Sequence, residues 1–274
     1  MTLVELIAQD LRLKPMSRGR YYVGVDHDSL VIDTKTGKWN WYSRGLWGDA
    51  KDWLEFWRGL SKDEAGRLAK KCEQGVYSPE PPKPLNPAKF AHFALCIGNV
   101  RARRYLSKRG LDQATIDYSM LGYSKGAISI PLIHKSQIWS VRYRAISPKS
   151  KKRYWSEGGS RNIYPYGLPF LLGQETLFIA EGEFKCLAVN QMGFDCIATA
   201  GSTFMPGWTE FTKPYRRVVL LRDSYELAGL AMAKRVRQII PNVIIQRIPD
   251  GHKAIDDFML ADYSKAKEFL NKLS

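Results

Sequence analysis

Two short apolar segments, each ending at an acidic residue and followed by a helix-forming stretch, constrain how this chain of 274 residues can fold. The first runs from Thr176 to Glu181 and the second from Val218 to Asp223. Nearly all-apolar strands of this kind are typical of parallel sheets that are covered on both faces. Ligands bind outside the carboxyl ends of such strands, so two neighbouring strands would place both carboxylates at one edge. The sequence therefore predicts an α/β sheet with a Mg²⁺ site at this edge.

A third apolar segment, Val243–Ile248, leads into three more acids that would lie near the same edge, Asp250, Asp256 and Asp257. Together these segments resemble the Toprim domain, the metal-binding fold shared by bacterial-type primases, topoisomerases and some nucleases. The motifs that carry the resemblance are Glu181-Gly182, Asp223 with Ala228-Gly229, and Ile248-Pro-Asp-Gly with Asp256-Asp257-Phe258. The alternative interpretation is that each acid merely begins a helix, where negative charge is favoured. The resemblance implies a Rossmann-like parallel sheet on the C-terminal side.

The second motif departs from the Toprim pattern. The family has a second Asp two residues after the first, and this chain has Tyr225 there. A neutral phenol is a poor ligand for Mg²⁺, which prefers carboxylate and water oxygens. One extra residue before Ala228 leaves Glu226 as the alternative ligand. The resemblance implies metal binding, of Mg²⁺ or Mn²⁺, by Glu181, Asp223, Glu226, Asp256 and Asp257, of which Glu181 and Asp223 are also catalytic.

Positive charge is concentrated in one quarter of the chain. Lys and Arg outnumber Asp and Glu by 42 to 27, and residues 101–161 contain fourteen basic residues against three acidic ones. Aromatic residues such as Tyr154 and Trp155 are interleaved with them, which favours a polyanion track with stacking platforms over a merely solvated surface. The residues expected to contact nucleic acid or NTP are Arg109, Arg142, Arg144, Lys149, Lys151, Lys152, Arg153, Arg161 and Lys185.

The segment before the two acidic motifs resembles the catalytic core of bacterial-type primases. The matching strings are Tyr105-Leu106, Arg109-Gly110-Leu111 and Leu121-Gly122-Tyr123. A helix is expected over residues 100–107, and strands over 127–133 and 137–144. In the second strand Arg142 and Arg144 are two residues apart and so share a face. The resemblance covers nearly the whole chain and is strongest between residues 100 and 260.

The first 60 residues predict a small β-rich unit. A helix is expected over 3–13, strands over 21–25, 29–33 and 38–42, and a further helix over 48–57. This order is similar to the N-terminal zinc-ribbon module of bacterial and phage primases, but its cysteine ligands are absent. Zinc is therefore not expected, because a structural zinc needs four ligands and His27 stands alone. Aromatic packing by Trp39, Trp41, Trp47 and Trp53 is the expected substitute, and an unrelated β unit is the alternative.

The prolines between residues 76 and 90 predict a semi-extended linker. The expected organisation is a zinc-ribbon-like module without metal ligands at 1–75, this linker at 76–90, a basic mixed α+β subdomain of a primase core at 91–170, and a Toprim domain at 171–274. The chain as a whole is thus α/β in its C-terminal part and α+β overall. The cysteines Cys72, Cys96, Cys186 and Cys196 are too scattered for a zinc site or a disulfide framework.

The function that the resemblance implies is a DNA primase, which joins NTPs into short primers on a single-stranded DNA template by metal-dependent nucleotidyl transfer. A Toprim nuclease and a catalytically weakened, primase-like single-stranded DNA-binding protein are the alternatives. No Gly-x-x-x-x-Gly-Lys-Ser/Thr motif is present, so a replicative helicase is expected as a separate partner. No apolar run is long enough for a membrane span, which predicts a soluble, intracellular protein. The resemblance implies the cytoplasm of a bacterial or phage-infected cell. An origin in a phage or mobile element fits by analogy.

Overall fold

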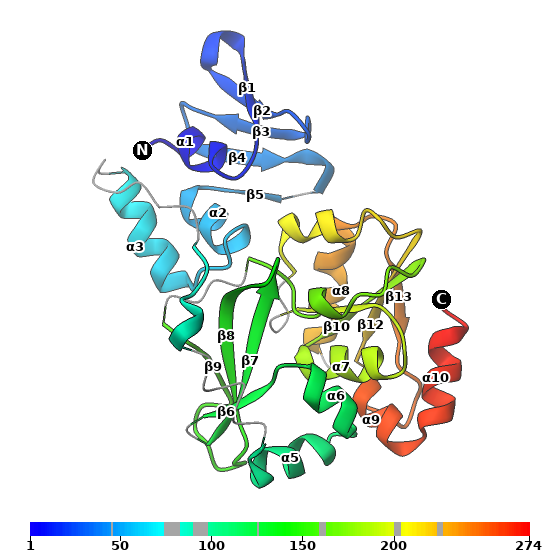
Figure 1. The fold of residues 1–274 in the computed structure, drawn as a ribbon. Helices are drawn as coiled ribbons and strands as arrows, with labels where there is room; N and C mark the ends of the chain where they lie inside the picture. The colour runs from blue at the N-terminus through cyan, green and yellow to red at the C-terminus, as the bar shows by residue number, and fades with distance from the viewer. Residues whose placement is uncertain are drawn as a thin grey trace. The chain divides into compact units, whose positions relative to one another are not determined.

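A computed structural model describes residues 1–44, 46–73, 83–89, 98–124, 126–158, 163–199, 204–223 and 227–274 (Figure 1). The chain forms two compact units, Met1–Lys83 with Met205–Gly207, and Pro84–Phe204 with Trp208–Ser274. Most of the predicted linker, 76–90, lies outside the described residues, as do Cys96, Arg161, Tyr225 and Glu226. Within the described ranges, no helix is long and apolar enough to cross a membrane.

The N-terminal unit is built on a five-stranded antiparallel sheet with its strands in chain order. The strands are β1 (Leu13–Met16), β2 (Tyr21–Gly24), β3 (Leu30–Asp33), β4 (Lys38–Trp41) and β5 (Leu46–Gly48), with helices α1 (Leu3–Ala8), α2 (Ala50–Phe56) and α3 (Lys62–Glu73) and short 3-10 helices η1 (Ser17–Gly19) and η2 (Tyr42–Arg44). The three predicted strands are confirmed as β2, β3 and β4. The helix predicted over 3–13 instead ends at Ala8, and the chain from Leu13 pairs with β2.

Local capping explains where two of these helices begin. Asp49 accepts backbone N–H bonds at the start of α2, and the Asp52 side chain accepts the N–H of Asp49, which completes a capping box. Ser61 accepts the backbone N–H of Glu64 at the start of α3. Each cap satisfies donors that a helix N-terminus otherwise leaves unpaired.

Tryptophan rings fill the core of the N-terminal unit. Trp39, Trp41 and Trp53 are at most 2% exposed. Trp57 stacks on Trp53, with ring centroids 5.0 Å apart, and also on Trp41. The prediction for Trp47 is wrong, because it lies on the edge strand β5 with its side chain 73% exposed. The aromatic core is therefore made by Trp39, Trp41, Trp53 and Trp57.

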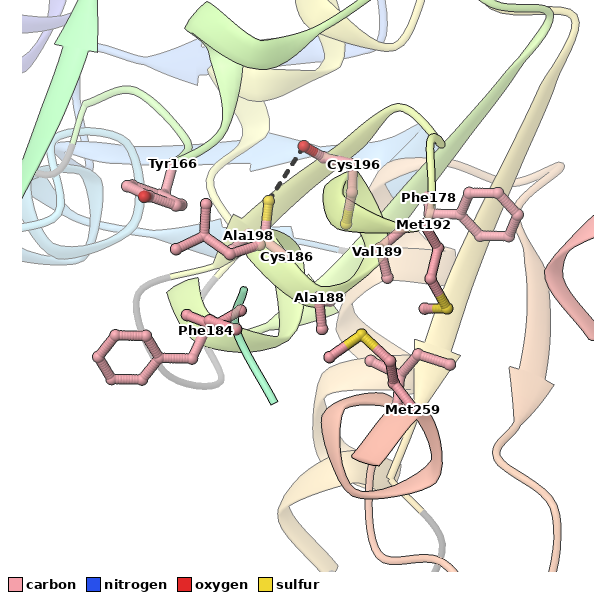
Figure 2. Packing of buried hydrophobic residues seen from close by; sticks show 14 of the residues in the cluster. Tyr166, Phe178, Phe184, Cys186, Ala188, Val189, Met192, Cys196, Ala198 and Met259 are labelled. Carbon is pink, nitrogen blue, oxygen red and sulfur yellow. Dashed lines mark hydrogen bonds between the residues drawn. The ribbon is translucent and has the colours of Figure 1, made fainter. Parts of the chain in front are cut away.

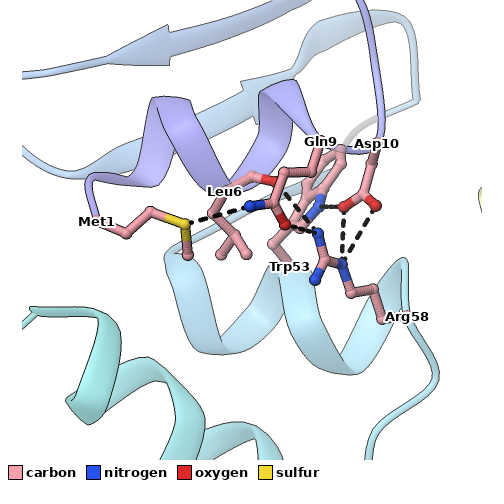
Figure 3. A network of polar contacts seen from close by, with 6 residues as sticks. All are labelled: Met1, Leu6, Gln9, Asp10, Trp53 and Arg58. Atoms are coloured by element: carbon pink, nitrogen blue, oxygen red, sulfur yellow. Dashed lines mark hydrogen bonds and ion pairs between the residues drawn. The ribbon is translucent and has the colours of Figure 1, made fainter. Parts of the chain in front are cut away.

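A buried ion pair ties this aromatic core to the N-terminal helix (Figure 3). The Arg58 guanidinium donates to both carboxylate oxygens of Asp10, at 3.2 and 3.0 Å, and to the side-chain oxygen of Gln9 at 2.9 Å. The Trp53 indole N–H donates to Asp10 at 2.8 Å. These contacts join the segment that follows α1 to the segment that follows α2, and breaking the buried pair would leave one charge without its partner.

We expect the N-terminal unit to fold without zinc, because apolar aromatic burial stabilises it. Elemental analysis of protein purified without chelator should give less than one zinc per chain. Far-ultraviolet circular dichroism and the thermal midpoint should be the same before and after EDTA treatment. Stoichiometric zinc, or a loss of structure in EDTA, would refute this expectation.

The second unit begins with an antiparallel sheet of order β6-β7-β8-β9. Its elements are η3 (Pro87–Lys89), α5 (Val100–Ser107), α6 (Gln113–Tyr118), β6 (Gly122–Ser124), β7 (Ala127–His134), β8 (Gln137–Ala145), β9 (Tyr154–Ser156) and η5 (Leu168–Phe170). The predictions of the helix over 100–107 and of the two long strands are confirmed. Asn99 and Asp112 cap α5 and α6 through their side-chain oxygens.

The C-terminal part of this unit is a parallel sheet of order β11-β10-β12-β13 (Figure 1). Its elements are β10 (Thr176–Glu181), α7 (Glu183–Gln191), β11 (Cys196–Thr199), η6 (Pro206–Phe211), β12 (Arg217–Arg222), α8 (Leu227–Ile239), β13 (Ile244–Arg247), α9 (Ile255–Ala261) and α10 (Tyr263–Asn271). The predicted fold class is confirmed, since antiparallel sheets are combined with a parallel sheet on the C-terminal side.

Residues of the central strand β10 are buried on both faces, as the apolar run predicts. Leu177, Phe178 and Ile179 are fully buried. Figure 2 shows the packing around α7, where the Cys186 thiol donates to the backbone oxygen of Cys196 at 3.1 Å. Cys72, Cys186 and Cys196 are buried and form no disulfide among the described residues, so these three side chains serve as small core residues.

Candidate functional site

The site is built where β10 and β12 end. These strands are neighbours in parallel register, with Ala180 opposite Leu221, so their carboxyl ends coincide. Glu181 is the last residue of β10 and Asp223 directly follows β12. The pairing of β10 with β12 confirms the prediction that the two strands lie side by side. Gly182 then turns the chain into α7 with a φ of 100°, a conformation that L side chains rarely adopt.

A cavity of about 390 Å³ opens at this edge. It is lined by Arg109, Arg142, Arg144, Tyr154, Glu181, Gly182, Glu183, Phe184 and Lys185. The basic side chains come from three places in the sequence: the end of the α5 region, strand β8 and the first turn of α7. Arg142 and Arg144 both face the cavity, as their spacing on one strand predicts. Four of the nine residues predicted to contact nucleic acid or NTP therefore meet beside Glu181.

Ion pairs link these basic side chains to acidic ones. Lys185 pairs with Asp223, and Arg142 pairs with Glu183. Arg109 donates to Asp256 at 2.5 Å. Glu183 is only 1% exposed, and its Oε2 atom has no hydrogen-bond partner among the described residues. A buried carboxylate oxygen without a partner is costly, so it is available to a donor or a cation brought by a ligand.

Aromatic rings hold the three guanidinium groups in place. Those of Arg142 and Arg144 lie over the Tyr154 ring, 5.1 and 4.5 Å from its centroid, and Arg109 lies 4.8 Å from the centroid of Phe184. The Nε atom of Arg144 donates to the Tyr105 hydroxyl at 3.2 Å. Stacked arginines lose less freedom when they bind an anion, which favours bidentate recognition of phosphate.

Electrostatics keep Arg109 and Tyr154 in their usual protonation states. Burial lowers the pKa of Arg109, but the charge of Asp256 and the contact with Tyr105 outweigh it, so the net shift is upward. Burial, followed by the charge of Glu183, raises the pKa of Tyr154, although the neighbouring arginines oppose that shift. Arg109 is therefore charged and Tyr154 neutral at physiological pH.

Other predicted site residues lie apart from the cavity lining. Lys149, Lys151, Lys152 and Arg153 are exposed on the connection between β8 and β9. In the first turn of α9, the Asp257 side chain accepts the backbone N–H of Lys253 at 3.0 Å, and Asp250, before that helix, pairs with Arg247. Tyr225, Glu226 and Arg161 lie outside the described residues.

Three lining residues, Tyr154, Glu183 and Phe184, were missed by the sequence predictions. Glu183 lies between Glu181 and Lys185, which were both predicted to belong to the site. Tyr154 was considered only as one of the aromatic residues interleaved with the basic segment. The signal for Glu183 was its place in the first turn of a helix beside Glu181. Its pairing with Arg142, 41 residues earlier, has no local signature.

The donor chemistry tests whether a divalent ion fits this site. Glu181 and Asp223 offer carboxylate oxygens, and the Oε2 atom of Glu183 has no hydrogen-bond partner among the described residues. Mg²⁺ usually binds proteins through one or two carboxylates together with substrate phosphates and water. No group of three His, Cys, Asp or Glu residues in the described ranges is arranged to hold a metal. The carboxylates alone would therefore leave a divalent ion short of ligands, and a substrate phosphate and water would have to supply the rest.

The fold is similar to those of solved primases. The Aquifex aeolicus primase, in a structure of its zinc-binding and RNA polymerase domains, matches 100% of this chain and 82% of its own, with 16% identity and a TM-score of 0.55. A DnaG primase catalytic domain bound to single-stranded DNA matches 68% of this chain and 75% of its own, with 15% identity and a TM-score of 0.56. The primase fragment of the bacteriophage T7 primase-helicase protein covers 88% and 93%, with 14% identity and a TM-score of 0.51.

No family model matches the sequence, and no curated protein matches it either. At identities of 14 to 16% the structural likeness shows the fold alone. The chain therefore has a DnaG-like primase fold.

Proposed function

We propose that this protein is a DNA primase, which synthesises short primers on single-stranded DNA by nucleotidyl transfer. One observation carries the proposal: within a primase fold, the cavity gathers Arg109, Arg142, Arg144 and Lys185 beside the strand ends that carry Glu181 and Asp223. Phosphate-binding cations next to a pair of carboxylates are what a polymerising site needs, because both the triphosphate and its metal ion must be held.

In this proposal the C-terminal parallel sheet is a Toprim domain, and Glu181 and Asp223 hold Mg²⁺ or Mn²⁺. When bound, the ion supplies Lewis-acid stabilisation of the negative charge on the transferring phosphoryl group. Arg142 and Arg144 grip the triphosphate and orient its α-phosphorus toward the primer 3′-hydroxyl. The other proposed ligands, Glu226, Asp256 and Asp257, complete the site. Of these, Asp256 would first have to leave Arg109.

The template is proposed to follow the basic residues outside the cavity. Lys149, Lys151, Lys152 and Arg153 form an exposed series on the chain just before Tyr154, and Arg161 follows it in the sequence. A fold neighbour was solved with single-stranded DNA, which supports this class of partner. A separate replicative helicase is the further proposed partner; in the T7 neighbour, primase and helicase belong to one protein.

A second candidate is a primase-like protein that binds single-stranded DNA without making primers. The observation that favours it is the pairing of Asp223 with Lys185, which neutralises one of the two central carboxylates. A nuclease that uses the same carboxylates is the third candidate.

Primer synthesis can be tested directly. The protein is incubated with single-stranded templates, labelled NTPs and either Mg²⁺ or Mn²⁺, and the products are separated on denaturing gels. Labelled primers of a few nucleotides are the expected result. Template cleavage would contradict the proposal in favour of a nuclease, and template retention without any product would favour the binding protein.

A further inference from the structure

A lysine side chain forms an ion pair with one of the two carboxylates proposed to hold metal. Lys185 belongs to the first turn of α7 and Asp223 directly follows strand β12, yet the two side chains form an ion pair. Both are mostly buried, with side-chain exposures of 18% and 9%. In the ligand-free protein, the charge of Asp223 is therefore balanced by a cation that belongs to the chain itself.

This pair opposes the binding of a free divalent ion. An ion that approaches Asp223 meets the ammonium on the same carboxylate, and like charges repel strongly where the surroundings are poorly hydrated. The ion would have to displace Lys185 and leave that ammonium within a few ångströms of itself. Binding of metal alone is therefore expected to be weak, although the carboxylates have suitable chemistry.

The same lysine has a second possible partner. Lys185 lines the cavity with Arg142 and Arg144, which are placed to receive phosphate. An ammonium on a flexible four-carbon stem can move between two anions, and phosphate is a common partner for lysine. A triphosphate in the cavity would thus attract Lys185 away from Asp223 and at the same time offer oxygen ligands to the metal ion.

We propose that the Lys185 ammonium group stays paired with Asp223 until a nucleoside triphosphate enters the cavity. It then leaves Asp223 and pairs with the phosphates of the triphosphate. Metal and triphosphate consequently bind cooperatively, and the site does not retain a resident ion. This inference rests on the proposed function, because it assumes a triphosphate in the cavity. By linkage, the gain in metal affinity that triphosphate produces equals the gain in triphosphate affinity that metal produces.

Replacing Lys185 with Met removes the charge, keeps the length and should change two affinities in opposite directions. Mn²⁺ alone, measured from the free-ion signal in electron paramagnetic resonance, should bind on the order of tenfold more tightly, equivalent to about 1.4 kcal/mol. Inorganic triphosphate, measured by calorimetry in EDTA, should bind several-fold more weakly. A merely structural ion pair would not produce opposite signs, since its loss would weaken both ligands or neither.

Two control variants accompany this measurement. Lys185→Arg keeps the positive charge and should leave Mn²⁺ affinity close to that of the natural protein. Lys213→Met removes a lysine that forms an exposed ion pair with Glu210. Lys213 precedes β12, whereas Asp223 follows it, so this variant should change neither affinity. Unchanged or weaker Mn²⁺ binding by Lys185→Met would overturn the proposal.

A second measurement covers the case in which Lys185→Met fails to fold. The ammonium resonance of Lys185 in a nitrogen-15 spectrum, assigned by its loss in Lys185→Arg, should shift when metal-free triphosphate is added. An unmoved signal in the presence of bound triphosphate would overturn the proposal.

These results are independent of primer synthesis. An inactive protein can show the opposite changes in affinity, and an active primase can lack them, so failure of the inference and failure of the proposed function are distinguishable.

Discussion

Glu181→Gln and Asp223→Asn should each reduce primer synthesis on the order of 10²- to 10³-fold or more, the range seen when one preorganised stabiliser of a transition state is removed. Both substitutions keep the shape of the side chain and remove its negative charge. Without that charge the site loses a ligand for the divalent ion, whereas the arginines that receive phosphate remain. The rate of incorporation of labelled NTP on a single-stranded template is the measurement.

Binding and folding serve as controls for these two variants. Affinity for single-stranded DNA and the thermal midpoint should change little, because the amide introduced by Asp223→Asn would still offer Lys185 an oxygen acceptor. Glu210→Gln removes an exposed carboxylate that pairs with Lys213 and should leave synthesis unchanged. If Glu181→Gln or Asp223→Asn retains full synthesis, the catalytic assignment of that carboxylate is wrong.

Charge reversal of Arg142, Arg144, Lys151 and Lys152 to Glu should remove most of the affinity for single-stranded DNA. Each phosphate that a basic side chain neutralises contributes about 0.7 to the slope of log affinity against log salt concentration, because counterions are released when the strand binds. The slope should therefore become shallower by about that amount for each phosphate that the variant no longer binds. Fluorescence anisotropy of a labelled oligonucleotide across a series of salt concentrations measures both the affinity and the slope.

The structure divides these four residues into two pairs that can be tested separately. Arg142 and Arg144 line the cavity, whereas Lys151 and Lys152 are exposed on the connection to β9. Lys151→Glu with Lys152→Glu should weaken DNA binding and leave triphosphate binding intact. Arg144→Gln should weaken triphosphate binding.

A matched reversal provides the control for nonspecific loss of charge. Lys213→Glu with Arg216→Glu changes two exposed basic residues that precede β12, at the end of the strand opposite Asp223. An equal loss of DNA affinity in this variant would show that net charge, and not the proposed track, governs binding.

Local patterns in the sequence were sufficient for the elements that define the site. The apolar runs that end at Glu181 and Asp223 predict β10 and β12, and the parallel-sheet rule places their ends together. The spacing of Arg142 and Arg144 predicts their common face on β8. These predictions depend on periodicity and burial over a few neighbouring residues, which the sequence carries directly.

Shorter or less periodic elements escaped the same reasoning. Strand β1 contains Pro15 and has three of its four residues exposed, and β5 is only three residues long, so neither has an alternating pattern. Trp47 was expected in the core because tryptophan is usually buried. Its place on the edge strand β5 turns it to solvent, and Trp57 takes part in the stack instead.

The sequence by itself determined that carboxylates and basic residues lie in one region of the fold, since strand ends and charge clusters can be read along the chain. Only the tertiary structure decided which acid faces which base. Arg109 meets Asp256 across 147 positions, and Lys185 meets Asp223 across 38. Ion pairing acts through space and depends on how α7, α9 and the two sheets pack, so residue spacing contains no record of it. For that reason the charge of Lys185 was enough to predict that it lies beside a phosphate. Its ion pair with Asp223, a carboxylate proposed to bind metal, could be found only from the tertiary structure.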